Sequence, residues 1–473
     1  MLNHPLSAMP SYHADRGCRT KVAKLFTNPD LMKYSIYNSV LNIDERHSLL
    51  YNASSDMFVV LNPRERILLE TGEPKELEKV YPKLYIQLQA CKAIVPKGKN
   101  ESQDLANDLR NIIEDKTRYE LQVNPTVDCN FRCWYCYENH VRGSRMNEDM
   151  VERLKHHINY VISSQIGLKH FHLSFFGGEP LLYFSHVASP LIGYAKQACE
   201  HNGIHLSLHF TSNGYLIHEQ MLPVFKGIQT SFQITLDGAK EHHDHTRFMP
   251  NGKGSYDRII SNIKLLTSNS IEVLLRINYT AANMQDISTI CPSLANIPNE
   301  QKVLLHVNFQ RVWQDSDCKF HDDEVRNCIE KQMQAFEESG FKVSYHKVMT
   351  GTPCYGDLRN YALVNYNGDV FCCTARDFTH KHRAGYLNEN GQIVWENDEK
   401  NRRISLKFSR EVCHKCRIAP ICCGGCTQRA IERGNAPGCL FDYTERDIND
   451  MLLERFEHLF MERKIASQPK KIS

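Results

Sequence analysis

The sequence contains no uninterrupted apolar run of membrane-spanning length, and its first ten residues contain no apolar core of signal-peptide length. Its net charge is only +2, so it lacks the basic excess that favours binding to nucleic acid. These absences predict a soluble, cytoplasmic protein whose partners include neither a membrane nor a nucleic acid. With 473 residues, the chain is long enough for two or three domains.

Cysteine, in contrast, is abundant, with 18 residues, and in a chain without a secretory signal this indicates metal binding rather than disulfides. Cys129, Cys133 and Cys136 have the spacing Cys-x3-Cys-x2-Cys. Three thiolates so placed can hold three irons of a [4Fe–4S] cluster and leave the fourth iron open to a cofactor. The alternative is a set of three of the four ligands of a structural zinc ion, because thiolates also bind zinc.

A second informative element begins at a predicted buried strand, Phe171–Phe176, which leads into Gly177-Gly178-Glu179-Pro180. The glycines allow close approach of the backbone to a ligand, and the carboxylate can accept hydrogen bonds from an ammonium group. An ordinary turn is the alternative reading. Polar residues also recur at the ends of the next three predicted strands, and the carboxyl ends of parallel barrel strands form a shared site.

The cysteine triplet and the Gly-Gly-Glu element together resemble those of the radical S-adenosylmethionine (SAM) enzymes. In that family a three-cysteine [4Fe–4S] cluster binds SAM through its open iron, the Gly-Gly-Glu element binds the SAM amine, and an aromatic residue precedes the third cysteine. The family also often has a His-x3-Arg pattern after the fourth strand, which His243 and Arg247 match, although a loop salt bridge is equally compatible. The resemblance implies that SAM contacts Tyr135, Gly177, Gly178, Glu179, Ser212, Asn213, Thr235 and Arg276.

Six predicted strands alternate with helical patterns, which favours repeated βα units with the helices outside. The strands lie near residues 121–127, 170–176, 205–210, 231–236, 272–278 and 303–309. One of the helical segments, Tyr256–Leu266, is preceded by Ser255 as a predicted N-cap. The resemblance implies an α/β fold, a partial (β/α)6 radical SAM barrel from about Tyr119 to Gly340, within a domain that we place at residues 106–345.

The region after the barrel resembles the Cys-rich SPASM extension, which carries two auxiliary [4Fe–4S] clusters. Its pattern is Cys354, Gly368 and Cys373, followed by Cys413-x2-Cys416-x5-Cys422-x3-Cys426 and Cys439, with a final gap that is shorter than usual. We place the SPASM domain at residues 346–445 and a C-terminal helix and tail at 446–473.

Motif position assigns Cys354, Cys373 and Cys426 to the first auxiliary cluster. The second cluster takes Cys413, Cys416, Cys422 and Cys439. Because only three cysteines remain for the first cluster, it has an open iron or takes Cys372 or Cys423 as a fourth ligand. Structural zinc is the alternative for the Cys413–Cys426 region.

Residues 1–105 form a predicted N-terminal domain of different character. Three strands are expected at Lys33–Val40, His47–Tyr51 and Met57–Leu61, followed by helices at Pro63–Leu69 and Lys75–Ala90 and a linker at Pro96–Gln103. These elements resemble the small α+β, winged-helix-like peptide-recognition domain fused to enzymes that modify ribosomally made peptides. A leader peptide would then add as a strand to an exposed sheet edge, with Met57–Leu61 as the candidate edge. A plain capping domain for the barrel is the alternative.

The leading functional hypothesis is a maturase that abstracts hydrogen from a ribosomally made precursor peptide and installs a thioether, ether or carbon–carbon cross-link. Its cofactors would be SAM and three [4Fe–4S] clusters, and its partners would be the leader-bearing precursor peptide and a reductant such as flavodoxin or ferredoxin. An anaerobic sulfatase-maturing enzyme is the second hypothesis, but that group typically has Asp directly after the position of Cys373, where this chain has Thr374. A non-catalytic metal-bearing peptide adaptor is the third, and the sequence assigns no catalytic acid or base.

Overall fold

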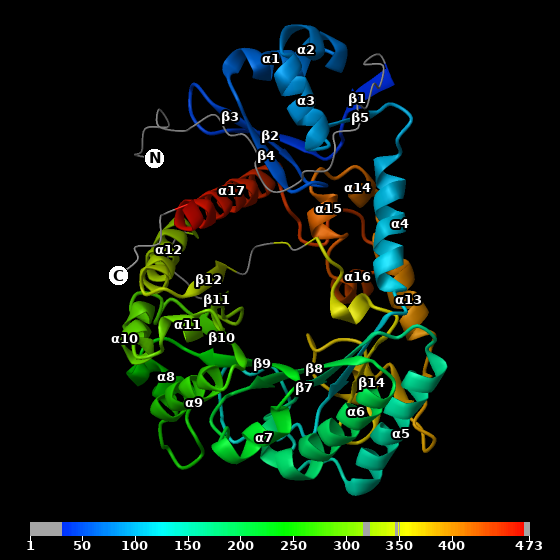
Figure 1. Cartoon of the computed structure of the whole chain (residues 1–473), viewed down its shortest axis with the longest axis vertical. Coiled ribbons are helices and arrows are strands. Elements are labelled where there is room, and N and C mark those ends of the chain that lie inside the picture. Colours follow the sequence, from blue (N-terminus) through cyan, green and yellow to red (C-terminus); the bar gives the residue numbers. More distant parts are fainter. Residues whose placement is uncertain (1–30, 316–321, 346–348, 350, 468–473) are drawn as a thin grey trace. The chain divides into compact units, whose positions relative to one another are not determined.

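The computed structural model describes residues 31–315, 322–345, 349 and 351–467 (Figure 1). The chain divides into two compact units, Met1–Glu101 and Ser102–Ser473. Within the described ranges, no helix combines the length and the apolar character needed to cross a membrane.

The first unit contains a small antiparallel sheet of three strands. Its middle strand is β3 (Ser48–Asn52), whose residues are all buried, while β2 (Asn38–Asn42) and β4 (Met57–Leu61) pair with its two sides and form the edges of the described sheet. The other elements of this unit are β1 (Met32–Tyr34), which pairs with β5 (Ile94–Pro96), and the helices α1 (Pro63–Thr71), α2 (Pro74–Val80) and α3 (Pro82–Ala90).

Two predicted elements of this unit are each divided in the structure. The segment Lys33–Val40 is not one strand, since β1 ends at Tyr34 and β2 begins only at Asn38. The predicted helix Lys75–Ala90 is interrupted at Tyr81, where φ is −132° and ψ is 65°. The cause is Pro82, because proline has no N–H to donate and disfavours helical backbone at the residue before it.

The predicted linker Pro96–Gln103 is too long, because helix α4 (Glu101–Ile113) already begins within it. Glu101 is buried, and its carboxylate accepts hydrogen bonds from Ser35 Oγ at 2.5 Å and from the Ile36 N–H at 3.1 Å. A residue held by two bonds to the first strand region cannot belong to a solvated linker, and only the tertiary contacts reveal this.

The second unit contains the large, mostly parallel sheet predicted from the alternating strands and helices. Its strands β6 to β12 lie next to one another in chain order, and neighbours are parallel throughout. They are β6 (Arg118–Val123), β7 (His170–Phe175), β8 (His205–Ser212), β9 (Gln229–Leu236), β10 (Glu272–Tyr279), β11 (Leu305–Arg311) and β12 (Lys342–Tyr345). The first six are the predicted barrel strands, although β6 ends before the predicted Val127 because Pro125 follows it.

The sheet continues beyond β6 into the Cys-rich region. There β13 (Tyr361–Val364) pairs with β6 in parallel, and the next three strands continue as antiparallel pairs. These strands are β14 (Asp369–Phe371), β15 (Gly385–Leu387) and β16 (Ile393–Trp395).

Helices connect the parallel strands, and α5, α6, α7 and α9 lie along one face of the sheet (Figure 1). Their bounds, with those of the neighbouring helices, are α5 (Glu148–Ser164), α6 (Ser189–His201), α7 (Leu222–Phe225), α8 (Lys240–Thr246), α9 (Tyr256–Ser268), α10 (Cys291–Leu294), α11 (Asn299–Lys302) and α12 (Asp322–Glu338). The Cys-rich region adds α13 (Glu399–Leu406), α14 (Glu411–His414), α15 (Ala419–Cys422), α16 (Thr427–Arg433) and the C-terminal α17 (Glu445–Ser467). The predicted helix at Tyr256–Leu266 is thus confirmed as α9, with Ser255 at its N-cap position.

The two faces of the parallel sheet differ in polarity. On the helix-covered face, aromatic rings of adjacent strands stack, with Phe175, Phe210 and Phe232 separated by 4.8 Å between successive ring centroids. On the opposite face, alternate residues are polar and only partly buried, such as His209 and Thr211 of β8. A polar, half-buried inner face suits a sheet whose concave side receives a ligand rather than a second apolar layer.

A buried histidine ties the helix layer to the antiparallel part of the sheet. His157 of α5 is 2% exposed; its Nδ1 donates to the Gly391 carbonyl at 2.7 Å, and its Nε2 lies 2.7 Å from the Tyr119 hydroxyl, which donates to it. Burial disfavours the charged ring and lowers the pKa of His157 to about 4 from 6.5, although the bond to the Gly391 carbonyl opposes this.

We therefore predict that the protein loses stability on acidification through His157. Between pH 6.5 and 4 the unfolded chain binds a proton at this residue that the folded chain does not, so lowering the pH from 7 to 5 costs about 2 kcal/mol. His157→Leu should remove that component and, at pH 7, cost about 1–3 kcal/mol because Tyr119 and Gly391 lose their partner. Urea unfolding at both pH values measures these changes.

The neighbouring exposed His156 provides the control, and His156→Leu should leave the unfolding curves at both pH values close to those of the wild type. An equal loss of stability for the two variants would contradict the role given to His157.

Candidate functional site

The loop that carries the first three cysteines follows β6 and is shaped by local hydrogen bonds rather than by regular secondary structure. Thr126 Oγ1 donates to the Ser144 carbonyl at 2.6 Å, and Ser144 Oγ accepts from the Val127 N–H at 3.1 Å. The Asp128 carboxylate accepts from the N–H groups of Cys129 and Gly143, each at 2.8 Å. The start of the cysteine loop is thereby closed onto residues 143–144.

Gly177 and Gly178 allow the end of β7 to pack closely against this loop. Gly177 has φ +84°, and a Cβ atom there would lie 2.5 Å from the Thr126 carbonyl oxygen. At Gly178 a Cβ atom would lie only 2.0 Å from the Asp128 carbonyl oxygen, which accepts the Glu179 N–H at 2.9 Å. The close approach that these glycines permit is therefore to the chain's own cysteine loop.

Glu179 is completely buried at the point where three strands end. Its carboxylate accepts hydrogen bonds from Ser212 Oγ at 2.9 Å, from the Asn213 N–H at 2.8 Å and from the Leu181 N–H at 3.0 Å. Burial raises the pKa of Glu179 to about 7, and these bonds only partly oppose the rise. The Asn213 side chain donates to Asn130 Oδ1 at 2.7 Å and lies 3.9 Å from Cys129 Sγ. The structure thus brings Glu179, Ser212 and Asn213 together beside Cys129.

Tyr135 lies in a second polar group on the other side of the cysteine loop. Its hydroxyl donates to Asp237 Oδ2 at 2.7 Å and accepts from Arg247 at 2.6 Å and from Asn278 Nδ2 at 3.1 Å. Arg276 Nε donates to Asn278 Oδ1 at 2.8 Å. Thr235, another of the residues predicted to contact SAM, lies opposite Arg276 of β10 in the sheet. No side-chain hydrogen bond joins it to this polar group in the described structure.

Sequence reasoning missed Asp237 and Asn278, although both stand at strand ends that it had identified. The signal was the same for both, a polar side chain directly after alternating apolar residues, and Asp237 is 2% exposed with its pKa raised by burial. Arg247, named only as a candidate, reaches this group through its bond to Tyr135 and lies 4.0 Å from Asp237 Oδ1.

His243, the other candidate, supports the loop instead. Its Nδ1 accepts the Asp237 N–H at 3.2 Å, and its Nε2 donates to Ser255 Oγ at 2.9 Å, which in turn donates to the Arg247 carbonyl at 2.8 Å. Burial lowers the pKa of His243 well below its usual range, so the ring is neutral and fixed in this tautomer.

The donor set fits the cluster and the cofactor implied by the sequence. Among the described residues, no three His, Cys, Asp or Glu side chains are grouped as ligands of a single metal ion. Each cysteine of a [4Fe–4S] cluster binds a different iron, so its three thiolates need not meet at one point. Several buried polar atoms around the loop have no hydrogen-bond partner in the described structure, as expected where a polar ligand binds. They are Asn130 Nδ2, Glu138 Oε2, Asp237 Oδ1, Arg247 Nε and Gln314 Oε1.

Electrostatic interactions link several of the C-terminal cysteines to one another. Burial is the main cause of the raised pKa values of Cys354 and Cys373. A smaller rise comes from a neighbouring thiol, which is Cys373 for Cys354 and Cys426 for Cys373. Cys422 is coupled in the same way to a second set, which contains Cys413, Cys416 and Cys439. Each of these interactions joins cysteines that motif position assigns to the same cluster, and both ligand sets remain predictions.

The buried surroundings of the first ligand set carry positive charge. Lys407 forms an ion pair with Asp357 at 2.8 Å, with side-chain exposures of 4% and 2%. Arg403 is also buried, and its charge opposes the rise in the pKa of Cys373, as the charge of Lys407 does for Cys354. Buried cations beside thiols favour the thiolate form that iron requires.

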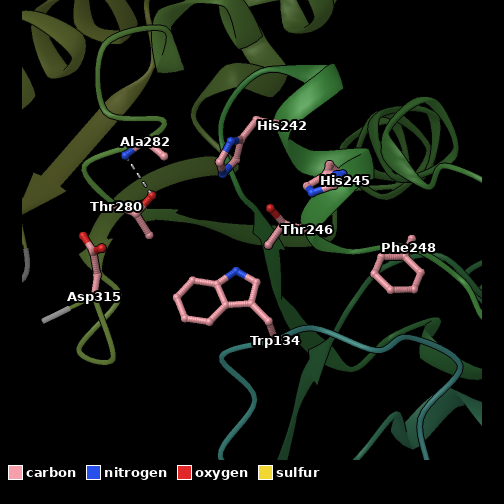
Figure 2. A pocket seen from close by; sticks show the side chains of 8 residues that line it. All are labelled: Trp134, His242, His245, Thr246, Phe248, Thr280, Ala282 and Asp315. Carbon is pink, nitrogen blue, oxygen red and sulfur yellow. Dashed lines mark hydrogen bonds between the residues drawn. The ribbon is translucent and has the colours of Figure 1, made fainter. Parts of the chain in front are cut away.

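A pocket of about 380 Å³ lies beside the cysteine loop at Trp134, whose indole is 59% exposed. Figure 2 shows Trp134 opposite His242, with Thr280 and Asp315 on one side and Phe248 on the other. The complete lining is Trp134, His242, His245, Thr246, Phe248, Thr280, Ala282 and Asp315.

Comparisons with known proteins agree with this geometry. Residues 123–290 match the model described as the Radical SAM superfamily. A cysteine-type anaerobic sulfatase-maturating enzyme of Clostridium novyi (strain NT) is 29% identical over 147 residues, covering 31% of this chain and 39% of that protein. The radical SAM cyclopropyl synthase TigE of Paramaledivibacter caminithermalis is 24% identical over 206 residues, covering 40% of this chain and 41% of that protein. The chain thus spans about two fifths of the length of these curated relatives.

A solved structure of anSMEcpe with bound AdoMet shares the fold. It superimposes with a TM-score of 0.53 at 17% identity and covers 73% of this chain and 97% of that chain. At this identity the similarity concerns the fold alone.

We predict that Gly178→Ala disrupts the site, because its methyl group would meet the Asp128 carbonyl and displace the cysteine loop. After reconstitution without oxygen, SAM binding should weaken by about 10- to 100-fold, as when the support of a metal ligand is removed. Iron analysis and equilibrium SAM binding measure the effect.

Gly193→Ala in α6 is the matched control, since no atom lies within 4 Å of a Cβ atom there and the backbone is helical. It should bind iron and SAM normally. Normal SAM binding by Gly178→Ala as well would show that the loop does not need this close contact.

Proposed function

Because this chain is a radical SAM enzyme related to anaerobic sulfatase-maturating enzymes and to peptide-modifying SPASM enzymes, we propose that it oxidises a ribosomally made precursor peptide and installs a thioether, ether or carbon–carbon cross-link. Cys129, Cys133 and Cys136 would hold a [4Fe–4S] cluster, and SAM bound there would supply the radical chemistry that removes a hydrogen atom from a substrate carbon. The observation that carries the radical step is the packing of Glu179, Ser212 and Asn213 beside Cys129.

The residues around the cofactor site have distinct roles in this proposal. Cys129, Cys133 and Cys136 hold the cluster, and the polar groups centred on Glu179 and on Tyr135 bind and orient SAM. The Asp237, Arg247 and Asn278 side chains fix the Tyr135 hydroxyl and so set the position of the loop between the second and third cysteines. The proposed barrel is the parallel sheet β6–β11, whose polar inner face would receive the peptide.

Two auxiliary clusters are part of the same proposal. The support is that Cys373 interacts electrostatically with Cys426, and Cys422 with Cys413, Cys416 and Cys439. Cys372 and Cys423, considered as extra ligands, are 3% and 1% exposed, and Cys423 Sγ donates to the Pro420 carbonyl at 3.7 Å. We therefore assign the first cluster three cysteines and an open iron.

The N-terminal unit is proposed to bind the leader of the precursor peptide. Its support is the antiparallel sheet in which β4, the predicted docking strand, lies at an edge with pairing on only one side in the described structure. An added peptide strand would extend this sheet through main-chain hydrogen bonds. Flavodoxin or ferredoxin is the proposed electron donor to the SAM cluster.

A sulfatase-maturing activity is the second candidate, favoured by the relative from Clostridium novyi and by the fold shared with anSMEcpe. Thr374 stands where such enzymes typically have Asp, and its Oγ1 is engaged by the Tyr355 hydroxyl. A separate N-terminal unit also favours the precursor-peptide proposal. The gene neighbourhood separates the two candidates, since a short adjacent reading frame supports the first and a sulfatase gene the second. The complete cysteine triplet and buried Glu179 argue against a non-catalytic adaptor.

We expect the protein reconstituted without oxygen to bind about twelve irons, four for each of three clusters. The triple variant Cys129→Ala, Cys133→Ala, Cys136→Ala should retain about eight irons and form no 5′-deoxyadenosine with dithionite, since the ligand sets are separate. Iron analysis and Mössbauer spectra provide the count. Wild-type protein with one cluster and bound zinc would refute the auxiliary clusters.

We also expect the cognate precursor peptide to slow amide exchange in β4 but not in β2, the opposite sheet edge. Hydrogen-exchange mass spectrometry with any short peptide encoded beside this gene makes the comparison. Deleting the residues before Gly98 should weaken peptide binding while sparing uncoupled SAM cleavage, because the module acts by raising local peptide concentration. Full turnover by the truncated enzyme at low peptide concentration would reduce the unit to a cap.

A further inference from the structure

An oriented aspartate–histidine pair lies between two cysteine-bearing segments. Asp377 Oδ1 accepts from His382 Nδ1 at 2.7 Å and from Thr379 Oγ1 at 2.9 Å, while Asn139 Nδ2 donates to Asp377 Oδ2 at 3.2 Å. Burial opposes ionisation of Asp377, but the bonds from Thr379 and His382 outweigh it and lower the pKa of Asp377. The carboxylate is therefore charged and holds the His382 ring with Nδ1 protonated, which leaves the Nε2 lone pair free to accept a proton.

The loop that carries this pair packs against the carboxyl end of strand β7. The Phe378 ring packs edge-on against Phe176, with 6.1 Å between ring centroids, and Phe176 directly precedes Gly177 at the end of β7. Phe378 also packs against Phe371, at 5.3 Å. A pair anchored by Phe378 on one side and by Asn139 on the other lies next to the cysteine loop and follows Cys373 closely in the chain.

A second anchor holds the same loop from the Cys-rich side. Arg376 forms two hydrogen bonds with the Glu432 carboxylate, at 2.7 and 2.5 Å, which join the loop to α16. The Asp377 and His382 side chains are 27% and 24% exposed, and partly exposed ion pairs of this kind contribute only about 0–1 kcal/mol to stability. Stability alone is thus a weak reason for such an oriented pair.

We propose that His382 is the catalytic base that takes the substrate proton, with Asp377 as its positioning residue. This inference rests on the proposed peptide oxidation and adds to it the residue that sequence reasoning left unassigned. His382 would serve as the base in place of the Asp that sulfatase-maturing enzymes typically have at the position of Thr374, eight residues earlier in the chain.

The chemistry requires such a group. A thioether cross-link replaces one C–H bond and one S–H bond of the peptide with one C–S bond. The hydrogen atom from carbon goes to the nucleoside radical, one electron goes to an oxidised iron–sulfur cluster, and the thiol proton goes to Nε2 of His382. If the product is an aldehyde precursor instead, a C=S bond forms and the same hydrogen atom, electron and proton leave.

The test replaces His382 and Asp377 in the full-length reconstituted enzyme. The probes are a synthetic cysteine-containing peptide and any short peptide encoded beside the gene, each deuterated at its side-chain and α-carbons. His382→Gln should retain iron content, SAM cleavage and deuterium transfer to 5′-deoxyadenosine, while oxidised product falls by about 10²- to 10⁴-fold. Asp377→Asn should lower product formation less, since the base itself remains.

The exposed His380, in the same short turn, supplies the control, and His380→Gln should form product at the wild-type rate. Added imidazole should partly restore product formation by His382→Ala, which a merely structural role of His382 would not allow. Wild-type turnover by His382→Gln would overturn the assignment of the base alone. Failure of the wild-type enzyme to oxidise either peptide would overturn the proposed function, and the inference with it.

Discussion

The contact between Gly178 and the Asp128 carbonyl is the constraint on which the rest of the site depends. With a side chain at Gly178, the end of β7 could not lie against the cysteine loop, because a Cβ atom would overlap the carbonyl oxygen at 2.0 Å. That approach places Glu179 where Ser212 and Asn213 can reach its carboxylate, and it places Asn213 against Cys129. One backbone contact therefore sets the relative positions of the cluster ligands and the residues proposed to bind SAM.

The parallel sheet supplies the frame for this contact through the different polarity of its two faces. Stacked phenylalanines on the helix-covered face fix the strand register, and a one-residue slip would exchange them with the polar inner residues. This register places Leu236 opposite Ile277, so Asp237 and Asn278 follow at the same level, whereas Ser212 lies opposite Ile234. Burial of the apolar residues on the other face stabilises the sheet, so the face at the site can carry polar residues.

The Cys-rich region contains buried positive charges near its cysteines. Thiolate clusters are anionic, and burying them is costly unless positive groups lie nearby. The buried Lys407–Asp357 pair interacts with Cys354, and the buried Arg403 interacts with Cys373. The same region contributes the loop of Asp377 and His382, so the proposed electron acceptor and proton acceptor lie in one structural element.

Much of this protein could be read from its sequence, because the informative signals are local. Spacing alone singled out Cys129, Cys133 and Cys136, and alternating apolar residues predicted all six strands from β6 to β11, with errors only at their ends. Pro82 is also a local signal for the break at Tyr81, although the predicted helix continued through it. What the sequence determined by itself was the set of elements and the residue types at their ends.

Only the tertiary structure decided which of those residues meet. Tyr135, Asp237 and Asn278 are far apart in the chain, and their hydrogen bonds exist because loops after different strands converge at one edge of the sheet. The same holds for Asn139 and Asp377, and for Glu101, whose bonds to Ser35 and Ile36 turned a predicted linker into the start of a helix. Spacing and periodicity describe neighbours within a segment, whereas side-chain partners across segments follow from packing, and packing is fixed by the whole fold at once.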